Sequence, residues 1–392
     1  MKYLAALSLF LTASARAEFA VPGFELVYSY PVETSLEEPD LRLAQDAWPA
    51  MFDSATKTID IEQFYVTPST GEPLEQSLLA LERAAKRGVK IRVILEKKFE
   101  KNSLDGIARL KAIPDLDLRI LDWSKVNGDG IIHAKFFVVD STQAFVGSHN
   151  FDWRALKHIH ELGLRITDPD VVTSVQKVFN HDWALTDAAA APQEEQREPW
   201  FERAGRAYLV ASPWRRNPDG VGDSEAELVR LIGEASSDLA IQLLDYNPTT
   251  YARPKRFYSP IDNALRDAAV RGVKIRLLVS HWNTDEHSVA HIKSLSLVPG
   301  IEVRVITIPE AKQGPIPFAR TAHSKYMVAD GKATWIGTSN WAGGYLDSSR
   351  NLEIVVKDAP LAARTAAMHA RLWGSPYSEP LQVQKIYPKP RK

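Results

Sequence analysis

The chain reads His133-Ala-Lys-Phe-Phe-Val-Val-Asp140 at one point and His323-Ser-Lys-Tyr-Met-Val-Ala-Asp330 at another. After six further residues each copy continues with a second block, Gly147-Ser-His-Asn150 or Gly337-Thr-Ser-Asn340. A single His-x-Lys has little meaning, but two intact copies with one internal spacing indicate a duplication. The period of about 190 residues is far too long for a solenoid repeat.

The sequence around the motifs is duplicated as well. Arg-Gly-Val-Lys-Ile-Arg occurs at residues 87–92 and again at 271–276, and its glycines, Gly88 and Gly272, stand where a glycine commonly ends a helix. The pattern of apolar residues predicts the same succession of elements in both halves. The expected helices are 78–86, 171–185, 261–270 and 360–372, and the expected strands are 89–95, 116–121, 273–279 and 301–308.

This alternation of strands and helices predicts the α/β class. We expect two duplicated α/β/α sandwich domains, each with helices on both faces of a mostly parallel sheet. The domains should span residues 18–187 and 200–392, joined by a linker at 188–199 that is rich in Ala, Gln, Glu and Pro. A pseudo-twofold axis would relate them and place one active site at their interface.

The N-terminal segment predicts export. Residues 1–17 combine a basic start, a short apolar run and an Ala-Arg-Ala cleavage pattern, which is typical of a signal peptide. No later stretch has the roughly 18 consecutive apolar residues of a transmembrane span. With no cysteine and no glycosylation sequon in the chain, a periplasmic or secreted location is expected.

Composition limits the possible chemistry. The 392 residues include no cysteine, which excludes disulfides, thiolate metal sites and a cysteine nucleophile. The formal charge is −1, and removal of residues 1–17 would delete Lys2 and Arg16 and leave −3. Because the chain has no overall basic excess, any anionic substrate must be held by a local concentration of donors.

The duplicated motif can supply those donors. Residues two apart on a strand point to the same face, so His133 projects with Lys135 and His323 with Lys325. If the two halves face each other, two imidazoles, two ammoniums and the amides of Asn150 and Asn340 surround one small volume. Such a volume suits a phosphate group, whose charge would be neutralised without a metal or other cofactor.

Two imidazoles can divide the work of phosphoryl transfer. One, neutral, attacks phosphorus and forms a phosphohistidine, while the other gives a proton to the leaving oxygen and then activates water. We expect His133 to be the nucleophile and the two reacting nitrogens to lie about 6–7 Å apart. Glu161 and Glu353, each on a strand that follows its motif, are expected to hold the imidazoles in the required tautomer.

The pattern His-x-Lys-x(4)-Asp-x(6)-Gly-[Ser/Thr]-x-Asn, present twice, resembles the phospholipase D superfamily. Residues 130–140, 147–154, 336–341 and 374–377 are similar to the branch with animal lysosomal single-strand 5′ exonucleases and the poxvirus envelope phospholipase. The resemblance implies a bilobal fold with one shared active site and no metal. It also implies that Asp140 and Asp330 are structural. The residues to which it assigns catalytic roles are His133, His323, Lys135, Lys325, Asn150, Asn340, Glu161 and Glu353.

The substrate is the open question. The branch resemblance and the aromatic residues near the motifs favour a nuclease, specifically a 5′ exonuclease on single-stranded DNA or RNA, because bases stack on aromatic rings. The alternative is a phospholipase D or phosphatidyltransferase acting on phospholipids, and a more remote one is a non-catalytic module that binds phosphodiesters. No obligate protein partner is expected. Core packing competes with substrate contact for Trp341, and the residues expected to bind substrate are Ser148, Thr338, Trp341 and Tyr345.

Overall fold

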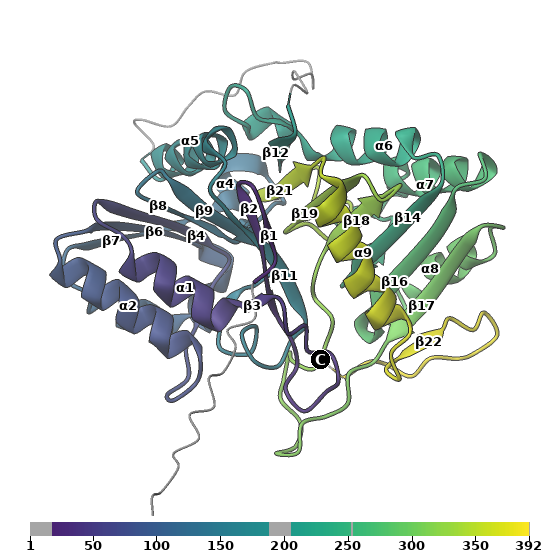
Figure 1. Ribbon diagram of the computed structural model, residues 1–392, viewed down its shortest axis with the longest axis horizontal. Helices are drawn as coiled ribbons and strands as arrows, with labels where there is room; N and C mark the ends of the chain where they lie inside the picture. The colour runs from purple at the N-terminus through teal and green to yellow at the C-terminus, as the bar shows by residue number, and fades with distance from the viewer. Residues whose placement is uncertain (1–17, 188–204, 252–253, 392) are drawn as a thin grey trace, which may run out of the picture.

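The computed structural model describes residues 18–187, 205–251 and 254–391. The described chain forms two halves that lie side by side, each built on a nine-stranded sheet (Figure 1). The expected signal peptide at 1–17 and the expected linker at 188–199 lie outside the described residues. None of the described helices is long and apolar enough to cross a bilayer.

The first sheet has the strand order β1-β2-β11-β9-β8-β4-β6-β7, with β3 added beside β2. A small parallel pair, β5 (Val66–Thr67) with β10 (Phe151–Asp152), lies outside it. The strands are β1 (Ala20–Val21), β2 (Phe24–Ser29), β3 (Arg42–Leu43), β4 (Thr58–Gln63), β6 (Lys90–Glu96), β7 (Leu116–Leu121), β8 (Phe136–Val139), β9 (Gln143–Gly147) and β11 (Glu161–Ile166). The helices are α1 (Ala44–Asp53), α2 (Leu74–Lys86), α3 (Leu104–Lys111), α4 (Trp123–Asn127) and α5 (Pro169–Leu185), with a 3₁₀ turn, η1 (Lys97–Asn102).

The second sheet repeats this plan in the order β13-β12-β21-β19-β18-β14-β16-β17-β22. Its small parallel pair is β15 (Tyr246–Asn247) with β20 (Trp341–Ala342). The strands are β12 (Ala207–Ser212), β13 (Gly222–Asp223), β14 (Asp238–Leu243), β16 (Lys274–Ser280), β17 (Ile301–Ile306), β18 (Tyr326–Ala329), β19 (Ala333–Gly337), β21 (Asn351–Val356) and β22 (Ser378–Pro380). The helices are α6 (Ser224–Glu234), α7 (Pro260–Val270), α8 (Val289–Ser296) and α9 (Ala359–Trp373), with 3₁₀ turns η2 (Trp214–Arg216) and η3 (His281–Thr284).

Both sheets are mixed, and the expectation of mostly parallel sheets was wrong. In the first half β4, β6 and β7 run parallel, whereas β4, β8, β9, β11 and β2 pair antiparallel. The reason is local: β8 and β9 are joined by a tight turn in which Asp140 and Ser141 both have positive φ, so the motif forms a hairpin. A hairpin connects antiparallel strands, whereas parallel strands need a long crossover.

Helices cover both faces of each sheet, which confirms the α/β/α architecture. Helices α1 and α2 pack on one face of the first sheet, and α5 packs on the other. In the second half α6 and α7 cover the outer face (Figure 1). Apolar residues of α5, α9, β11 and β21 belong to a single core cluster, so the two halves share one continuous apolar interface.

Candidate active site

Each His-x-Lys segment lies immediately before a central strand, β8 or β18, and alternates as expected. Ala134 and Phe136 enter the apolar core, while His133 and Lys135 face the other way. His133 is only 5% exposed, and His323 in the second half is 7% exposed. The side chains of both lysines are fully buried.

The two halves hold each other's histidines through the backbone. The amide of His133 donates to the carbonyl of Arg350 (2.9 Å), and the amide of His323 donates to the carbonyl of His160 (2.8 Å). Two isolated parallel bridges, Ile132 with Arg350 and Ala322 with His160, repeat this contact on the two sides of the pseudo-twofold. The imidazoles are therefore positioned by the domain interface, and neither half orients its own histidine alone.

The site brings two buried ammoniums close together. Burial, then the nearby Lys325 ammonium, holds the pKa of Lys135 well below its usual value. Burial lowers the pKa of Lys325 to about 7, and the carboxylate of Glu161 opposes that shift. Each ammonium donates to the carbonyl of its own motif histidine. Asp245 also opposes the shift of Lys325, and burial of both ammoniums favours an anionic ligand.

Glu161 pairs with the histidine of the opposite half. Both of its carboxyl oxygens lie 2.8 Å from Nδ1 of His323, and the hydroxyl of Ser148 donates to the same carboxyl. Burial raises the pKa of Glu161 to about 8. Burial, then the two motif lysines and His133, holds the pKa of His323 well below its usual value, so the two imidazoles are within electrostatic reach of each other.

The partner of His133 is an amide that sequence reasoning missed. Nδ1 of His133 lies 2.9 Å from Oδ1 of Asn351. The predicted partner, Glu353, instead accepts hydrogen bonds from the hydroxyls of Ser224 and Ser339. The prediction that Glu353 supports an imidazole was wrong because Glu353 stands two residues, about 7 Å, further along its strand.

The strand register shows how the two halves correspond. Gly147 and Gly337 open the second block of each motif and lie at the ends of β9 and β19. Each has one cross-strand partner on the following strand, β11 or β21. The residues that correspond are therefore Gly163 with Glu353, and, two positions earlier, Glu161 with Asn351.

The remaining motif residues divide into site and scaffold. Asn150 and Asn340 are buried, and Oδ1 of each, the acceptor end of the amide, has no hydrogen-bond partner among the described residues. Asp140 and Asp330 accept hydrogen bonds from backbone amides at the starts of β4 and β14. Those contacts are with Thr56, Lys57, Thr58, Ser236, Ser237 and Asp238.

Three of the four residues expected to bind substrate do not face an open site. Ser148 and Thr338 are fully buried, and their hydroxyls donate to Glu161 and Asn351. Trp341 is 1% exposed and packs edge-on against another core tryptophan, so core packing is the correct interpretation. They were misassigned because proximity to a motif in sequence does not tell which face a side chain takes.

The fourth, Tyr345, lies in a cluster of rings around His133. Its ring centroid is 4.7 Å from that of His133, and the ring of Phe64 is 5.3 Å away on the first-half side. Phe99 packs on Phe64 at 4.1 Å, and Tyr251, 49% exposed, packs on Tyr345 at 5.5 Å. Phe64 directly follows β4. The sequence could have indicated this residue, because site residues commonly follow the end of a strand.

Comparison with known proteins decides the family. The model described as "Cardiolipin synthase, PLD-like domain" matches residues 49–183 and 228–373. Phospholipase D Z of Dictyostelium discoideum is 31% identical over 368 residues, which cover 86% of this chain and 86% of that protein. The chain belongs to the phospholipase D superfamily. It is accordingly an enzyme of the phosphodiesterase type.

Other proteins that this chain resembles differ in named activity. The 5'-3' exonuclease PLD3 of Bos taurus is 31% identical over 376 residues, covering 86% of this chain and 76% of that protein. The phosphatidylserine synthase of Haemophilus influenzae Rd KW20 superposes with a TM-score of 0.60 at 11% identity, covering 86% of this chain and 85% of that one. At that identity the structural likeness shows the fold alone.

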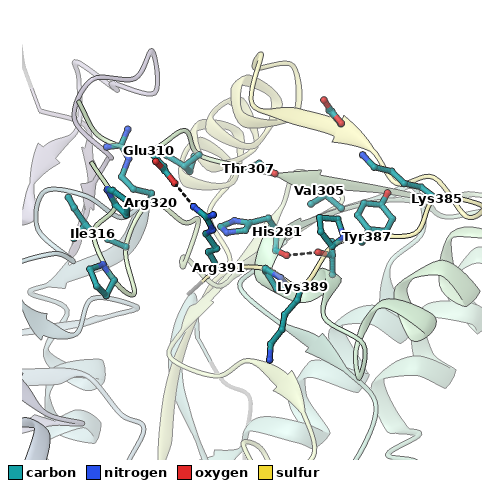
Figure 2. Close-up of a pocket in the computed structure, with 18 of the residues that line it drawn as sticks. His281, Val305, Thr307, Glu310, Ile316, Arg320, Lys385, Tyr387, Lys389 and Arg391 are labelled. Atoms are coloured by element: carbon teal, nitrogen blue, oxygen red, sulfur yellow. Dashed lines mark hydrogen bonds and ion pairs between the residues drawn. The ribbon is translucent and has the colours of Figure 1, made fainter. Parts of the chain in front are cut away.

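A cavity of about 710 Å³ lies in the second half of the chain (Figure 2). It is lined in part by the loop that carries Ile316 and Arg320 and by the C-terminal tail, where Arg391 forms an ion pair with Glu310. None of the motif histidines, lysines or asparagines lines it.

Within residues 18–187, 205–251 and 254–391, no group of three or more His, Cys, Asp or Glu side chains could hold a metal ion.

Proposed function

We propose that this chain is a metal-independent nuclease, a 5′ exonuclease on single-stranded DNA or RNA, that works through a phosphohistidine. The pair of buried lysines binds the phosphodiester, and the amides of Asn150 and Asn340 donate to its oxygens. The negative charge of the phosphate compensates the two ammoniums, of which that of Lys325 otherwise lowers the pKa of Lys135. Catalysis then rests on preorganised donors and on two imidazoles.

The chemistry takes two steps. Nε2 of His133 attacks phosphorus and forms the N–P bond, while the P–O bond to the leaving group breaks and its oxygen takes a proton from Nε2 of His323. In the second step His323 accepts a proton from water, whose oxygen forms a new P–O bond. The N–P bond breaks, and its electron pair returns to His133.

The observation that carries the choice of nucleic acid is the ring cluster on both sides of His133. Phe64 and Phe99 come from the first half, and Tyr345 and Tyr251 come from the second. Two bases next to the reacting phosphate can stack on such rings, at about 1–3 kcal/mol per base, without a long basic groove. The similarity to an exonuclease relative supports the same choice.

Phospholipids are the second candidate class of substrate, because another relative of equal identity is named a phospholipase D.

We further propose that the protein is exported to a periplasm or secreted, as the N-terminal sequence pattern indicates.

One assay separates the two substrate classes. Purified protein in EDTA receives a 5′-hydroxyl single-stranded oligonucleotide labelled at its 3′ end, and, in parallel, vesicles of phosphatidylcholine or cardiolipin. We expect stepwise shortening of the oligonucleotide with the label retained, and no cleavage by the His133→Ala variant. Lipid hydrolysis without oligonucleotide cleavage would contradict the nuclease proposal and favour the phospholipase.

A further inference from the structure

The supports of the two imidazoles occupy equivalent positions but differ in charge. Nδ1 of His323 faces the carboxyl of Glu161, whereas Nδ1 of His133 faces the amide of Asn351. The surroundings otherwise match, since a motif hydroxyl donates to each support. The duplicated fold therefore presents two histidines in similar geometry with unlike partners.

The orientation of the Asn351 amide is fixed by its neighbours. Its Nδ2 donates to the carbonyl of Tyr345 at 2.8 Å, which only the NH₂ end can do. Its Oδ1 accepts the hydroxyl hydrogen of Thr338, because the oxygen of that hydroxyl already accepts the amide of Leu352. Oδ1 is thus an acceptor, so Nδ1 of His133 carries the hydrogen and Nε2 keeps its lone pair.

The charged groups around the two rings also differ, and they favour a proton on His323 over one on His133. Burial and the ammoniums of Lys135 and Lys325 hold the pKa of His133 well below its usual value, and the hydrogen bond with the neutral Asn351 amide offsets them only in part. His323 faces the same ammoniums but has a carboxyl at hydrogen-bond distance. The other titratable groups close to the two rings are His149 beside His323 and the phenol of Tyr345 beside His133.

We propose that Asn351 is a positioning residue that makes the two imidazoles unequal: it keeps His133 as the neutral nucleophile and leaves the proton-donating role to His323 beside Glu161. The inference rests on the proposed phosphohistidine chemistry and adds to it the residue that makes the two roles differ. The amide accepts the Nδ1 hydrogen but carries no charge to balance an imidazolium. The carboxyl accepts the same hydrogen and does stabilise one once phosphate has compensated the lysines.

The test is the Asn351→Asp variant, assayed on bis(p-nitrophenyl) phosphate over a range of pH. A carboxylate next to Nδ1 should raise the pKa of His133, so the acidic limb of kcat/KM moves up by about one pH unit. Activity at the acidic end then falls about tenfold and recovers toward the wild-type rate at higher pH. The matched control is Glu161→Gln, which should move the alkaline limb to lower pH and leave the acidic limb in place. Equal loss at every pH in Asn351→Asp would mean a structural role only and would overturn the proposal.

A second measurement uses the wild-type protein and does not depend on a variant that folds. Turnover is quenched in alkali, which preserves phosphohistidine, and the modified peptide is located by mass spectrometry. We expect the phosphate on the peptide that contains His133, and finding it on the peptide that contains His323 would overturn the assignment. Absence of any phosphodiester hydrolysis would refute the proposed function itself, which distinguishes the two failures.

Discussion

At the scale of single residues, Lys325 sets an upper pH limit for substrate binding. Burial lowers the pKa of its ammonium to about 7, so the free enzyme loses this positive charge as the pH rises through that value. We expect kcat/KM to fall above about pH 7. The pH–rate profile on bis(p-nitrophenyl) phosphate checks this, with Lys325→Arg as the control, because a guanidinium stays charged and should extend the plateau. A rate that climbs steadily past about pH 9 would contradict the prediction.

The two histidines should respond differently to removal. His133→Ala deletes the nucleophile and should abolish turnover with every substrate. His323→Ala deletes the proton donor and should retain more activity when the leaving group is p-nitrophenolate, which needs no proton, than when it is an alkoxide. Kinetics with both substrate types measure the difference. Equal residual activity in the two variants would rule out this division of roles.

The two glutamates separate an orienting role from a structural one. Glu161→Gln should lower kcat by roughly 10²-fold or more, because His323 loses the carboxyl group that lies at its Nδ1 and orients the ring. Glu353→Gln should keep most of the activity per folded molecule, since Glu353 bonds to Ser224 and Ser339 and not to an imidazole. Comparable loss of kcat in both variants would refute this separation.

Glu353 should also leave a signature in stability against pH. Burial raises its pKa from 4.5 to about 7, so the folded protein holds a proton that the unfolded chain releases between these values. This contribution to the free energy of unfolding is present below pH 4.5 and is lost as the pH rises through about 7. Urea unfolding of wild type and Glu353→Gln at several pH values measures it. A difference between the two that does not change over this range would contradict the assignment.

At the scale of elements, Asp140 and Asp330 tie the motif hairpins to the neighbouring strands. Each carboxylate accepts backbone amides at the start of a parallel strand, and backbone hydrogen bonding holds the pKa of each below its usual value against the opposing effect of burial. Asp140→Ala should therefore lower the free energy of unfolding by about 2 kcal/mol or more while activity per folded molecule is retained. Denaturant titration measures this, with exposed Asp117→Ala as the control.

Most elements could be predicted from the sequence because their periodicity and end signals are local. Strand β7 has the predicted bounds, helix α7 begins one residue earlier than predicted, and Gly88 follows the end of α2 with a φ of +84°. The direction of β9 could not be read from periodicity, since alternation is the same in parallel and antiparallel sheets. The hydrogen-bond partner of His133 was missed because a carboxylate, Glu353, was expected to hold the ring. The strand register instead makes Asn351 the equivalent of Glu161.

At the scale of the whole molecule, a buried ion pair joins the two halves. The guanidinium of Arg350 is fully buried and donates to both oxygens of Asp182 on α5, at 2.7 and 2.9 Å. The carbonyl of the same arginine accepts the amide of His133, so the pair connects the interface to the reaction site.

Arg350→Met should lower the free energy of unfolding by about 3–5 kcal/mol, because it leaves Asp182 buried without its partner. We also expect kcat to fall, since the segment that holds His133 loses its anchor. Thermal unfolding and kinetics on the same preparation test both statements. Unchanged stability would show that the pair does not hold the halves together.

The exchange of backbone contacts between the halves has a consequence for how the site could diversify. In an assembly of two identical subunits, any substitution beside one histidine appears beside both, so the two rings stay chemically the same. Fusion of the copies into one polypeptide removes that constraint, and Glu161 and Asn351 are then free to differ. Covalent linkage thus permits each copy to specialise while both still build a single reaction centre.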